Sequence, residues 1–511
     1  MITEDQQEAI AFLTAPDTHD GQRVDRIDTH TSIVVLAGER AYKLKRAVRF
    51  DYLDFSTAAI RRRFCEAEVT LNRRTAPSLY RRVRAVTRRP DGALEFDGSG
   101  PPIDWVIEME RFPQAHLFNR LAETGRLDLE LIDQLAEHIA AFHRLAEPRS
   151  DQGGQRGMRW VADGNAAGFA EFGTQLDRSQ CDQLHEGTVR AIERHAHLLD
   201  DRRARGYVRH CHGDLHLGNI VLLDGRPTLF DGIEFNDAIA CADVLYDLAF
   251  LLMDLWRRAL PGHANRLLNV YLSSADVEGL TLLPLFLSCR AAVKAKTSAT
   301  AAQMQHHAAA RGEIDREAAA YLAMAVTLLQ PAAPRLVAIG GFSGSGKSTL
   351  ARAVASSIGA VPGAIVLRSD DIRKRLFDVN PLNRLGPDAY TPAVSARVYR
   401  TMADEAACIL RTGHSVIVDA VYSENAERTR IEQVAHDTSS TFSGFWLDAP
   451  EATLAARVTQ RQRDASDADA AVVHAQVARG CGHMAWQRLD ARHHTAALST
   501  LALRALSATT Q

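Results

Sequence analysis

The sequence predicts two successive domains of different fold class. The first is an α+β domain with a small sheet lobe followed by a larger helical lobe, and the second is an α/β domain with a parallel sheet. Strand-like runs are concentrated in residues 25–112, whereas residues 113–330 are mostly helical in pattern. Two prolines in residues 331–334 end the last helical stretch. A buried strand at residues 335–340 then leads into a glycine-rich loop and a helix, as in a parallel α/β sheet.

The bulk composition agrees with two domains that act on small molecules. A chain of 511 residues is long enough for two to four domains, and we expect residues 1–330 and 335–511 to form them, with residues 331–334 as the linker. A net charge of −3 gives no strong nucleic-acid or membrane signal. Seven scattered cysteines without a CxxC pair indicate reduced thiols rather than a zinc site. No signal peptide or long apolar run is evident, so we expect a cytoplasmic protein.

Lysine is rare in this chain, and the few lysines indicate candidate phosphate sites. Only six of the sixty basic side chains are lysine. A retained lysine indicates a position where a compact ammonium is needed and a planar guanidinium fails, and a phosphate site is such a position. Four of the six, Lys43, Lys45, Lys347 and Lys374, lie in stretches that suit phosphate handling. The sequence therefore predicts two separate nucleotide sites.

The sheet lobe combines a lysine-bearing strand with an acidic helix. Period two places Lys43 and Lys45 on the same side of their strand, so geometry does not separate them. We favour Lys43 as the phosphate ligand and keep Lys45 as the alternate. On the helix predicted for residues 56–74, Glu68 borders the apolar face whereas Glu66 points nearly opposite. Glu68 is therefore the better partner for the lysine, and a solvated ion pair with nearby arginines is the alternative.

Residues 212–219, with the sequence HGDLHLGN, form a candidate catalytic loop. Asp214 stands five residues before Asn219, and a hairpin predicted for residues 220–230, with an Asp-Gly turn, then leads to Asp231. One carboxylate can orient or deprotonate a substrate hydroxyl. An amide oxygen and a second carboxylate can hold Mg²⁺ against phosphates.

These residues resemble the aminoglycoside phosphotransferase and choline kinase superfamily, whose fold is a two-lobed protein-kinase-like domain. The signature HGDxHxxN is matched at residues 212–219, and the resemblance covers about residues 25–300. It implies that ATP and Mg²⁺ are cofactors, that Asp214 is the base, and that Asn219 and Asp231 are metal ligands. It further implies a strand lysine on the phosphates, held by a helix glutamate. The family's usual aromatic or apolar residue after the metal aspartate is replaced by Gly232.

The second domain carries the phosphate-binding pattern G-x-x-x-x-G-K-S at residues 341–348, between a strand and a helix. Glycines allow backbone amides to cradle a phosphate, and the helix N-terminus adds partial positive charge. The predicted nucleotide-binding residues are Gly341, Gly344, Gly346, Lys347, Ser348 and Thr349. Ser348 is also a predicted Mg²⁺ ligand. The pattern predicts a P-loop NTPase domain.

The acceptor side of this domain follows a strand predicted at residues 364–367. Asp370 comes after this strand and can take a proton from a hydroxyl, while Arg373 can hold the acceptor or its phosphate. The pattern S-D-x-x-R resembles small P-loop kinases related to polynucleotide kinase, gluconate kinase and zeta toxin, over about residues 335–480. Asp419 ends another buried strand and is predicted to help hold Mg²⁺, with a turn or helix cap as the alternative.

A further helix resembles the lid of the same kinases. Arg457 and Arg461 lie four residues apart on one face of it, where they can neutralise charge on the transferring phosphate. A solvated basic face is the alternative. Residues 464–468 also resemble the S-D-A stretch of these kinases.

We therefore expect a bifunctional ATP-dependent kinase whose domains each phosphorylate an alcohol group of a small molecule or nucleotide. Two alternatives stay open. One domain can be an ATP-binding regulator of the other, or the second domain can act on a polynucleotide 5′-hydroxyl or a nucleotide sugar.

Overall fold

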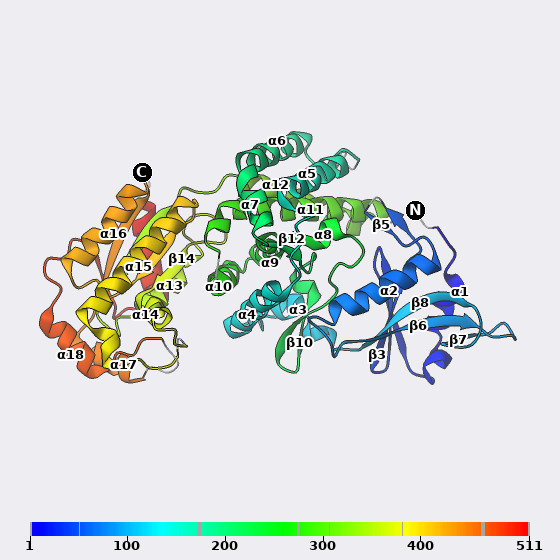
Figure 1. The fold of residues 1–511 in the computed structure, drawn as a ribbon, viewed down its shortest axis with the longest axis horizontal. Coiled ribbons are helices and arrows are strands. Elements are labelled where there is room, and N and C mark those ends of the chain that lie inside the picture. Colours follow the sequence, from blue (N-terminus) through cyan, green and yellow to red (C-terminus); the bar gives the residue numbers. More distant parts are fainter. Residues whose placement is uncertain are drawn as a thin grey trace. The chain divides into compact units, whose positions relative to one another are not determined.

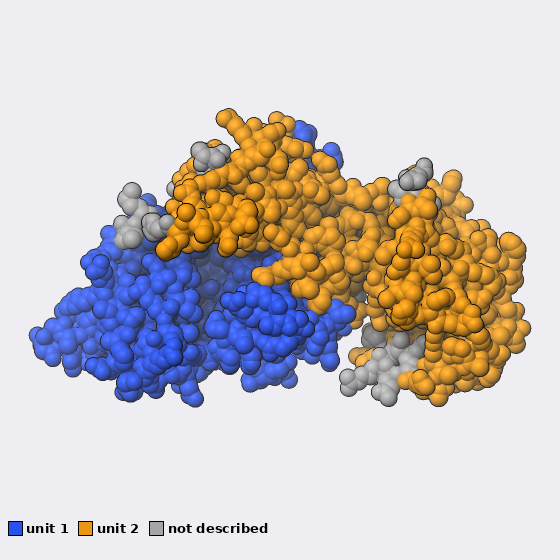
Figure 2. All heavy atoms as spheres, turned by 180° about the vertical axis from the view of Figure 1, so that it is seen from behind, with its two compact units in different colours: residues 1–164, 189–254 blue, residues 165–188, 255–511 orange. Residues whose placement is uncertain are grey.

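The computed structural model describes residues 3–50, 52–171, 175–272, 276–305, 307–380, 382–460 and 465–508. The chain divides into two compact units (Figure 2). The first unit comprises residues 1–164 and 189–254, and the second comprises residues 165–188 and 255–511. This division falls inside the predicted helical lobe, because the helices after residue 255 pack with the α/β part of the chain. The domain boundaries drawn from the sequence stay a prediction.

An antiparallel sheet forms the core of the sheet lobe in the first unit, with the strand order β1-β2-β3-β8-β6-β7 (Figure 1). The strands are β1 (Val24–Asp28), β2 (Ser32–Ala37), β3 (Arg40–Lys45), β6 (Tyr80–Arg88), β7 (Leu94–Phe96) and β8 (Pro102–Glu110). Tyr42 and Leu44 of β3 pack on the face that also receives Leu13 of α1 (Gln7–Thr14). Because side chains alternate along a strand, Lys43 and Lys45 share the opposite face.

Helix α2 (Ala58–Asn72) packs on that opposite face. Thr57 caps it by accepting a hydrogen bond from the amide of Ile60. Glu68 is fully buried. The helix also buries Arg61, which lies outside the predicted apolar face. The Arg61 guanidinium makes hydrogen bonds of 2.8 and 2.9 Å to the carboxylate of Asp104 on β8. This buried pairing is why apolar periodicity alone misplaces part of the packed face.

The rest of the first unit is mainly helical and contains three short strand pairs. The helices are η1 (Pro16–His19), η2 (Gln114–His116), α3 (Phe118–Glu123), α4 (Leu129–Leu145), α7 (Ala196–Ala204), η3 (Leu217–Asn219) and α8 (Asp237–Ala240). Helices α5 (Gly154–Glu171), α6 (Arg178–Arg194) and α9 (Val244–Arg257) run across the division between the units. The strand pairs are β4 (Arg49–Phe50) with β5 (Leu53–Asp54), β9 (Val208–His210) with β12 (Cys241–Asp243), and β10 (Ile220–Leu223) with β11 (Arg226–Leu229).

The β10–β11 pair confirms the predicted hairpin. Leu223 pairs with Arg226, so the two-residue turn consists of Asp224 and Gly225. Both turn residues have positive φ, 49° and 74°, as a tight hairpin of this kind requires.

The second unit contains a parallel sheet in the order β14-β15-β13-β16-β17, which confirms the predicted α/β class. Its strands are β13 (Arg335–Gly340), β14 (Ile365–Arg368), β15 (Val416–Asp419), β16 (Thr441–Asp448) and β17 (Gln487–Asp490). Around it lie α13 (Lys347–Ala355), α14 (Ser369–Leu376), η5 (Pro387–Tyr390), α15 (Pro392–Arg411), α16 (Asn425–Asp437), α17 (Glu451–Gln460), α18 (Ala470–Arg479) and α19 (Thr495–Ala508).

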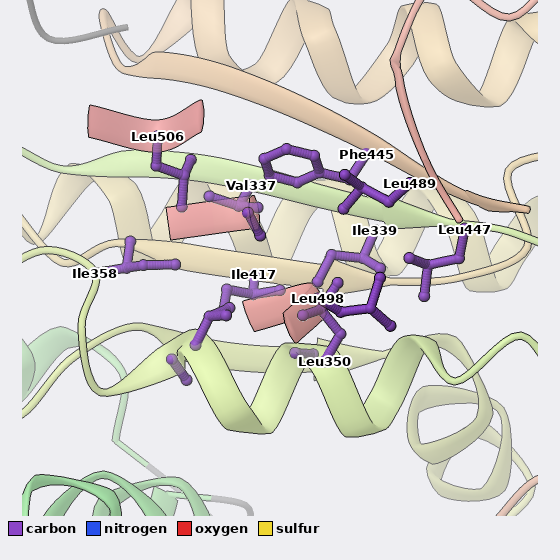
Figure 3. Packing of buried hydrophobic residues seen from close by; sticks show 14 of the residues in the cluster. Val337, Ile339, Leu350, Ile358, Ile417, Phe445, Leu447, Leu489, Leu498 and Leu506 are labelled. Atoms are coloured by element: carbon purple, nitrogen blue, oxygen red, sulfur yellow. The ribbon is translucent and has the colours of Figure 1, made fainter. Parts of the chain in front are cut away.

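One face of this sheet packs against α13 and α19 (Figure 3). Val337, Ile339 and Ile417 of the sheet meet Leu350 of α13 and Leu498 of α19. Parallel strands covered on both faces are apolar almost throughout, and all four residues of β15 are buried. The core thus fixes the carboxyl ends of β13, β14 and β15 beside one another.

Helices that precede the linker also belong to the second unit. They are α10 (Pro261–Leu272), η4 (Glu278–Leu282), α11 (Leu283–Met304) and α12 (Ala308–Leu328). None of the described helices is long and apolar enough to cross a membrane.

Two asparagines of α10 bind the edge strand β14. Asn269 accepts a hydrogen bond of 2.8 Å from the amide of Val366 through Oδ1. The amide groups of Asn265 and Asn269 donate to the carbonyl of Ala364 over 3.0 and 3.2 Å. These contacts satisfy backbone groups on the outer edge of the sheet, where a strand otherwise lacks partners. Helix α10 therefore completes the edge of the parallel sheet.

Replacing both asparagines by alanine is expected to loosen β14. The amide of Val366 and the carbonyl of Ala364 lose their partners, at a cost of about 1–3 kcal/mol for each unpaired buried group. Hydrogen–deuterium exchange at Val366 should then accelerate at least tenfold, while exchange at Val337 in the sheet centre stays unchanged. Asn425→Ala, at an exposed position on α16, is the control. Unchanged exchange at Val366 in the double variant would contradict this account of the edge.

Candidate active sites

The candidate catalytic loop of the first unit is held by two carboxylates of α9. Asp247 accepts hydrogen bonds from the amides of His212 and Gly213, over 3.2 and 2.8 Å, and Nε2 of His143 lies 3.1 Å from the same carboxylate. Asp254 accepts the amide of Leu217 over 3.0 Å. Asp247 is fully buried, so these bonds compensate for the loss of its hydration. The contacts fix the backbone on both sides of the residue predicted to be the base.

The predicted base and one predicted metal ligand are in direct contact. Nδ2 of Asn219 donates to the carbonyl and to Oδ2 of Asp214, over 3.0 and 2.9 Å. Because the amide nitrogen is used in this way, Oδ1 of Asn219 is the atom that would bind the predicted metal. His216 lies on the other side of Asp214, with Nε2 3.3 Å from Oδ2. Nδ1 of His216 accepts the amide of Gly218, so the proton of the neutral ring is on Nε2 and points to Asp214.

Asp231, the second predicted metal ligand, follows the hairpin in a left-handed backbone conformation with a φ of 63°. Its amide donates to the hydroxyl of Tyr80 over 3.1 Å. The next residue, Gly232, donates its amide to Oδ1 of Asn72 on α2 over 2.7 Å. Gly232 therefore forms a backbone contact with α2 in place of an aromatic side chain. Phe230 on the other side of Asp231 packs edge-on against Phe112.

Lys43 and Glu68 meet as predicted from the strand and helix periods. Nζ of Lys43 lies 2.8 Å from Oε1 of Glu68 and also forms an ion pair with Asp231. Burial acts to lower the pKa of Lys43, but Asp231 and Glu68 outweigh burial and raise that pKa well above its usual value. Burial acts in turn to raise the pKa of Glu68, and the ammonium groups of Lys43 and Lys45 hold it at about 2. Lys43 and Glu68 are therefore both charged at neutral pH.

Lys45 lies in the same buried network, with a partner that the sequence reasoning did not identify. Its Nζ is 2.5 Å from Oε2 of Glu68 and 2.5 Å from Oε1 of Glu234. Burial raises the pKa of Glu234 to about 7, because Lys45 offsets only part of the desolvation. A signal for Glu234 was its place three residues after Asp231, in an otherwise apolar stretch.

The second site forms where β13 enters α13. Ser348 donates to Oδ2 of Asp419 over 2.5 Å, and Asp419 is the last residue of the adjacent strand β15. Lys347 donates to the carbonyl of Phe342 within the loop over 3.2 Å, and Thr349 is exposed at the start of α13. A hydroxyl beside a carboxylate is a suitable Mg²⁺ site, because Mg²⁺ prefers oxygen ligands.

Glycine is required at two positions of this loop. Gly341 and Gly344 have φ values of 142° and 83°, and Gly346 has one of 91°. A Cβ atom on Gly341 would lie 2.7 Å from the carbonyl oxygen of Leu447, and one on Gly344 would lie 2.5 Å from that of Leu454. Larger residues would therefore displace the loop from the strand and from α17. Three amides of the loop already have partners within the protein: those of Gly341 and Ser345 donate to the carbonyls of Val421 and Phe342, and that of Ser343 donates to Oε1 of Gln476.

The predicted acceptor residues both lie on α14. Asp370 is in the first turn of α14, and burial, together with Asp419, raises the pKa of its carboxyl. Arg373 is buried and donates to the carbonyl of Ala389 over 2.5 Å, with its guanidinium 4.8 Å from the ring centre of Tyr390. Arg373 thus holds the segment before α15, and its role toward an acceptor stays a prediction.

Lys374 forms a buried ion pair with Asp467, in the S-D-A stretch. Its Nζ lies 2.8 Å from both carboxylate oxygens and also donates to the carbonyl of Asn383. The same carboxylate accepts the hydroxyl of Tyr390 over 2.5 Å and the amide of Leu385 over 3.0 Å. Asp467 therefore joins α14 to the loop that follows it. Sequence reasoning did not identify this role.

The predicted lid arginines are only partly described. Arg457 on α17 donates to the carbonyl of Ala491 over 2.9 Å, after the end of β17. Arg461 lies outside the described residues. Their roles in phosphoryl transfer stay a prediction.

Two family models match the chain in succession. Residues 95–281 match the phosphotransferase enzyme family, and residues 336–480 match an AAA domain. An uncharacterized protein of Mycobacterium tuberculosis is 32% identical over 488 residues, covering 91% of this chain and 92% of the relative. An uncharacterized protein of Mycobacterium bovis gives the same values.

Solved structures are similar to each part. A choline/ethanolamine kinase family protein from Mesorhizobium loti is 13% identical, covering 64% of this chain and 95% of its own, with a TM-score of 0.41. The Mycobacterium tuberculosis APS kinase in complex with AMPPNP and APS is 20% identical, covering 34% and 99%, with a TM-score of 0.27. Kinase domains of these two types use ATP and Mg²⁺. The chain belongs to the family of these mycobacterial proteins and is an ATP-dependent phosphotransferase with a protein-kinase-like domain followed by a P-loop kinase domain.

Proposed function

We propose that the chain is a bifunctional kinase in which each domain phosphorylates its own small-molecule acceptor. The first domain, residues 1–330, transfers the γ-phosphoryl group of ATP to a hydroxyl group. The second, residues 335–511, acts as a second small-molecule or nucleotide kinase. The observation that supports this proposal is that each site combines a carboxylate that can act as a base, a lysine and oxygen ligands for Mg²⁺.

In the first site, Asp214 accepts the proton of the acceptor hydroxyl as its oxygen bonds to the γ-phosphorus, and ADP leaves with the bridging oxygen. Asn219 and Asp231 would hold Mg²⁺, which would offset the charge on the phosphates. Lys43 binds the phosphates, since it has 12% of its side chain exposed and contacts Asp231. Its position between Glu68 and Asp231 places the ammonium beside the metal ligand.

In the second site, Asp370 takes the acceptor proton and Arg373 binds the acceptor. A carboxyl with a raised pKa is a stronger base once it is ionised. The glycine-rich loop and Lys347 hold the phosphates, while Ser348 and Asp419 would hold Mg²⁺ or its water. Arg457 and Arg461 are proposed to neutralise charge on the transferring phosphoryl group.

The test follows γ-phosphate from labelled ATP into a metabolite extract, with labelled products resolved by mass. Asp214→Asn removes the base of the first site, and Lys347→Ala removes the phosphate-binding lysine of the second. Each variant is expected to lose a different product, Asp214→Asn by about 10²–10⁴-fold, which is the usual contribution of a general base. Asp224→Asn, in the exposed hairpin turn, is the matched control.

Loss of all transfer in one variant, with only modulated transfer in the other, would refute two independent kinases. In that case one domain is an ATP-binding regulator. Loss of neither product would refute both site assignments.

We further propose that Asp467 organises the acceptor loop of the second site. Asp467→Asn leaves the buried Lys374 ammonium without its anionic partner, and breaking such a pair costs about 3–5 kcal/mol. Hydrogen–deuterium exchange in the acceptor loop, residues 382–391, should accelerate, and the KM for the acceptor of the second site should rise. Formation of the product of the first site should be unchanged. Asp388→Asn, exposed in the same loop, is the control. Equal effects of the two substitutions would contradict this role.

A further inference from the structure

We propose that Lys45 and Glu234 are positioning residues of the first site, which hold Glu68 in place so that Lys43 alone exchanges between Asp231 and the phosphates of a nucleotide. This inference rests on the proposed nucleotide site of the first domain. It assigns different tasks to two lysines that the strand period leaves equivalent.

Five ionisable side chains form a continuous series in which acidic and basic groups alternate. The order is Asp231, Lys43, Glu68, Lys45, Glu234, and each neighbouring pair is in ion-pair contact. The distances are 2.8 Å from Lys43 to Glu68, and 2.5 Å from Lys45 to each of its two carboxylates. One carboxylate, Glu68, therefore serves both lysines, one through each oxygen.

The two ends of this series differ in access to solvent. At one end, 42% of the Asp231 side chain and 12% of the Lys43 side chain are exposed. At the other end, the values are 2% for Lys45 and 5% for Glu234. The Lys45 ammonium also lies 4.8 Å from the ring centre of Phe55. A nucleotide that enters this site can therefore reach Lys43, whereas Lys45 is enclosed by its carboxylates and the aromatic ring.

The charge balance explains why a second pair is useful. When a phosphate draws the Lys43 ammonium, Glu68 shares this partner with a competing anion. A fully buried carboxylate without a cation is strongly disfavoured, so Glu68 would oppose the transfer. Lys45 gives Glu68 a permanent cation, and Glu234 binds the same Lys45 ammonium, so that Lys45 keeps a carboxyl partner besides Glu68. The pair thus lowers the cost of moving Lys43.

The same pair also connects the metal-binding segment to α2. Glu234 lies three residues after Asp231 and reaches Glu68 through Lys45. One helical turn after Glu68, Asn72 accepts the amide of Gly232 over 2.7 Å. The segment that carries Asp231 is therefore attached to α2 at two points. This attachment keeps the metal ligand and the lysine-binding glutamate in register when the nucleotide changes the contacts of Lys43.

The test uses the full chain with Lys347→Ala, so that nucleotide binding reports on the first site. Three further variants carry Lys43→Met, the pair Lys45→Met with Glu234→Gln, or all three substitutions. Dissociation constants are measured for Mg·AMP-PNP and for adenosine, which lacks phosphates. The paired substitution should weaken Mg·AMP-PNP about tenfold, a usual size for coupling within one charge network, and change adenosine affinity less than about twofold.

The decisive result is the behaviour of the triple variant. If Lys45 and Glu234 act through Lys43, the pair causes no further loss once Lys43 is methionine. Additive losses would show that Lys45 itself contacts the phosphates and would overturn the inference. An equal loss of adenosine affinity would also overturn it, because the pair would then be merely structural.

Two further variants keep the test decisive. Glu234→Gln alone retains the Lys45–Glu68 pair and replaces the paired variant if that variant does not fold. Its loss of Mg·AMP-PNP affinity should likewise not add to the loss caused by Lys43→Met. Lys45→Arg keeps the positive charge but replaces the compact ammonium by a planar guanidinium, so it should lose less affinity for Mg·AMP-PNP than the paired variant without recovering that of the unsubstituted site. Absence of any Mg·AMP-PNP binding in the Lys347→Ala protein would overturn the proposed function of the first site, and the inference with it.

Discussion

Pairing of buried lysines with carboxylates is the interaction on which both sites depend. Lys45 joins Glu68 to Glu234, and Lys374 joins α14 to Asp467. An ammonium offers three donors around one compact centre, so it can meet carboxylates that converge from different elements, whereas a guanidinium is a flat fork. This geometry gives a second reason for the retained lysines besides phosphate binding. The rarity of lysine indicated the candidate sites, and Lys43, Lys45 and Lys374 are all paired with carboxylates inside the protein.

Features with a local sequence signal could be predicted well. The hairpin of β10 and β11 follows from an Asp-Gly pair between apolar runs, because only a tight turn with positive φ joins such strands. The parallel sheet follows from apolar strands that alternate with helices. The strand period places Lys43 and Lys45 on one side of β3, and both contact Glu68, but the period does not distinguish between the two lysines.

Features that depend on partners far along the chain could not be predicted. Glu234 is 189 residues from Lys45, and Asp467 is 93 residues from Lys374. No period or turn rule connects such positions, because tertiary packing selects these partners. The buried face of α2 illustrates the same limit. Arg61 is buried because it forms hydrogen bonds with Asp104 of β8. A prediction from apolar periodicity places an arginine on the exposed face of a helix.

The edge strand β14 explains why the prolines before residue 335 do not separate the compact units. Strand β14 leads directly into the turn that carries Asp370, so its outer backbone groups must be satisfied if the base is to be held in place. Asn265 and Asn269 supply these partners from a helix that precedes the linker by more than fifty residues. A proline-rich connection shows where the chain changes direction. Which elements belong to one compact unit depends on which groups require partners, and here the backbone groups at the edge of the sheet are satisfied by α10.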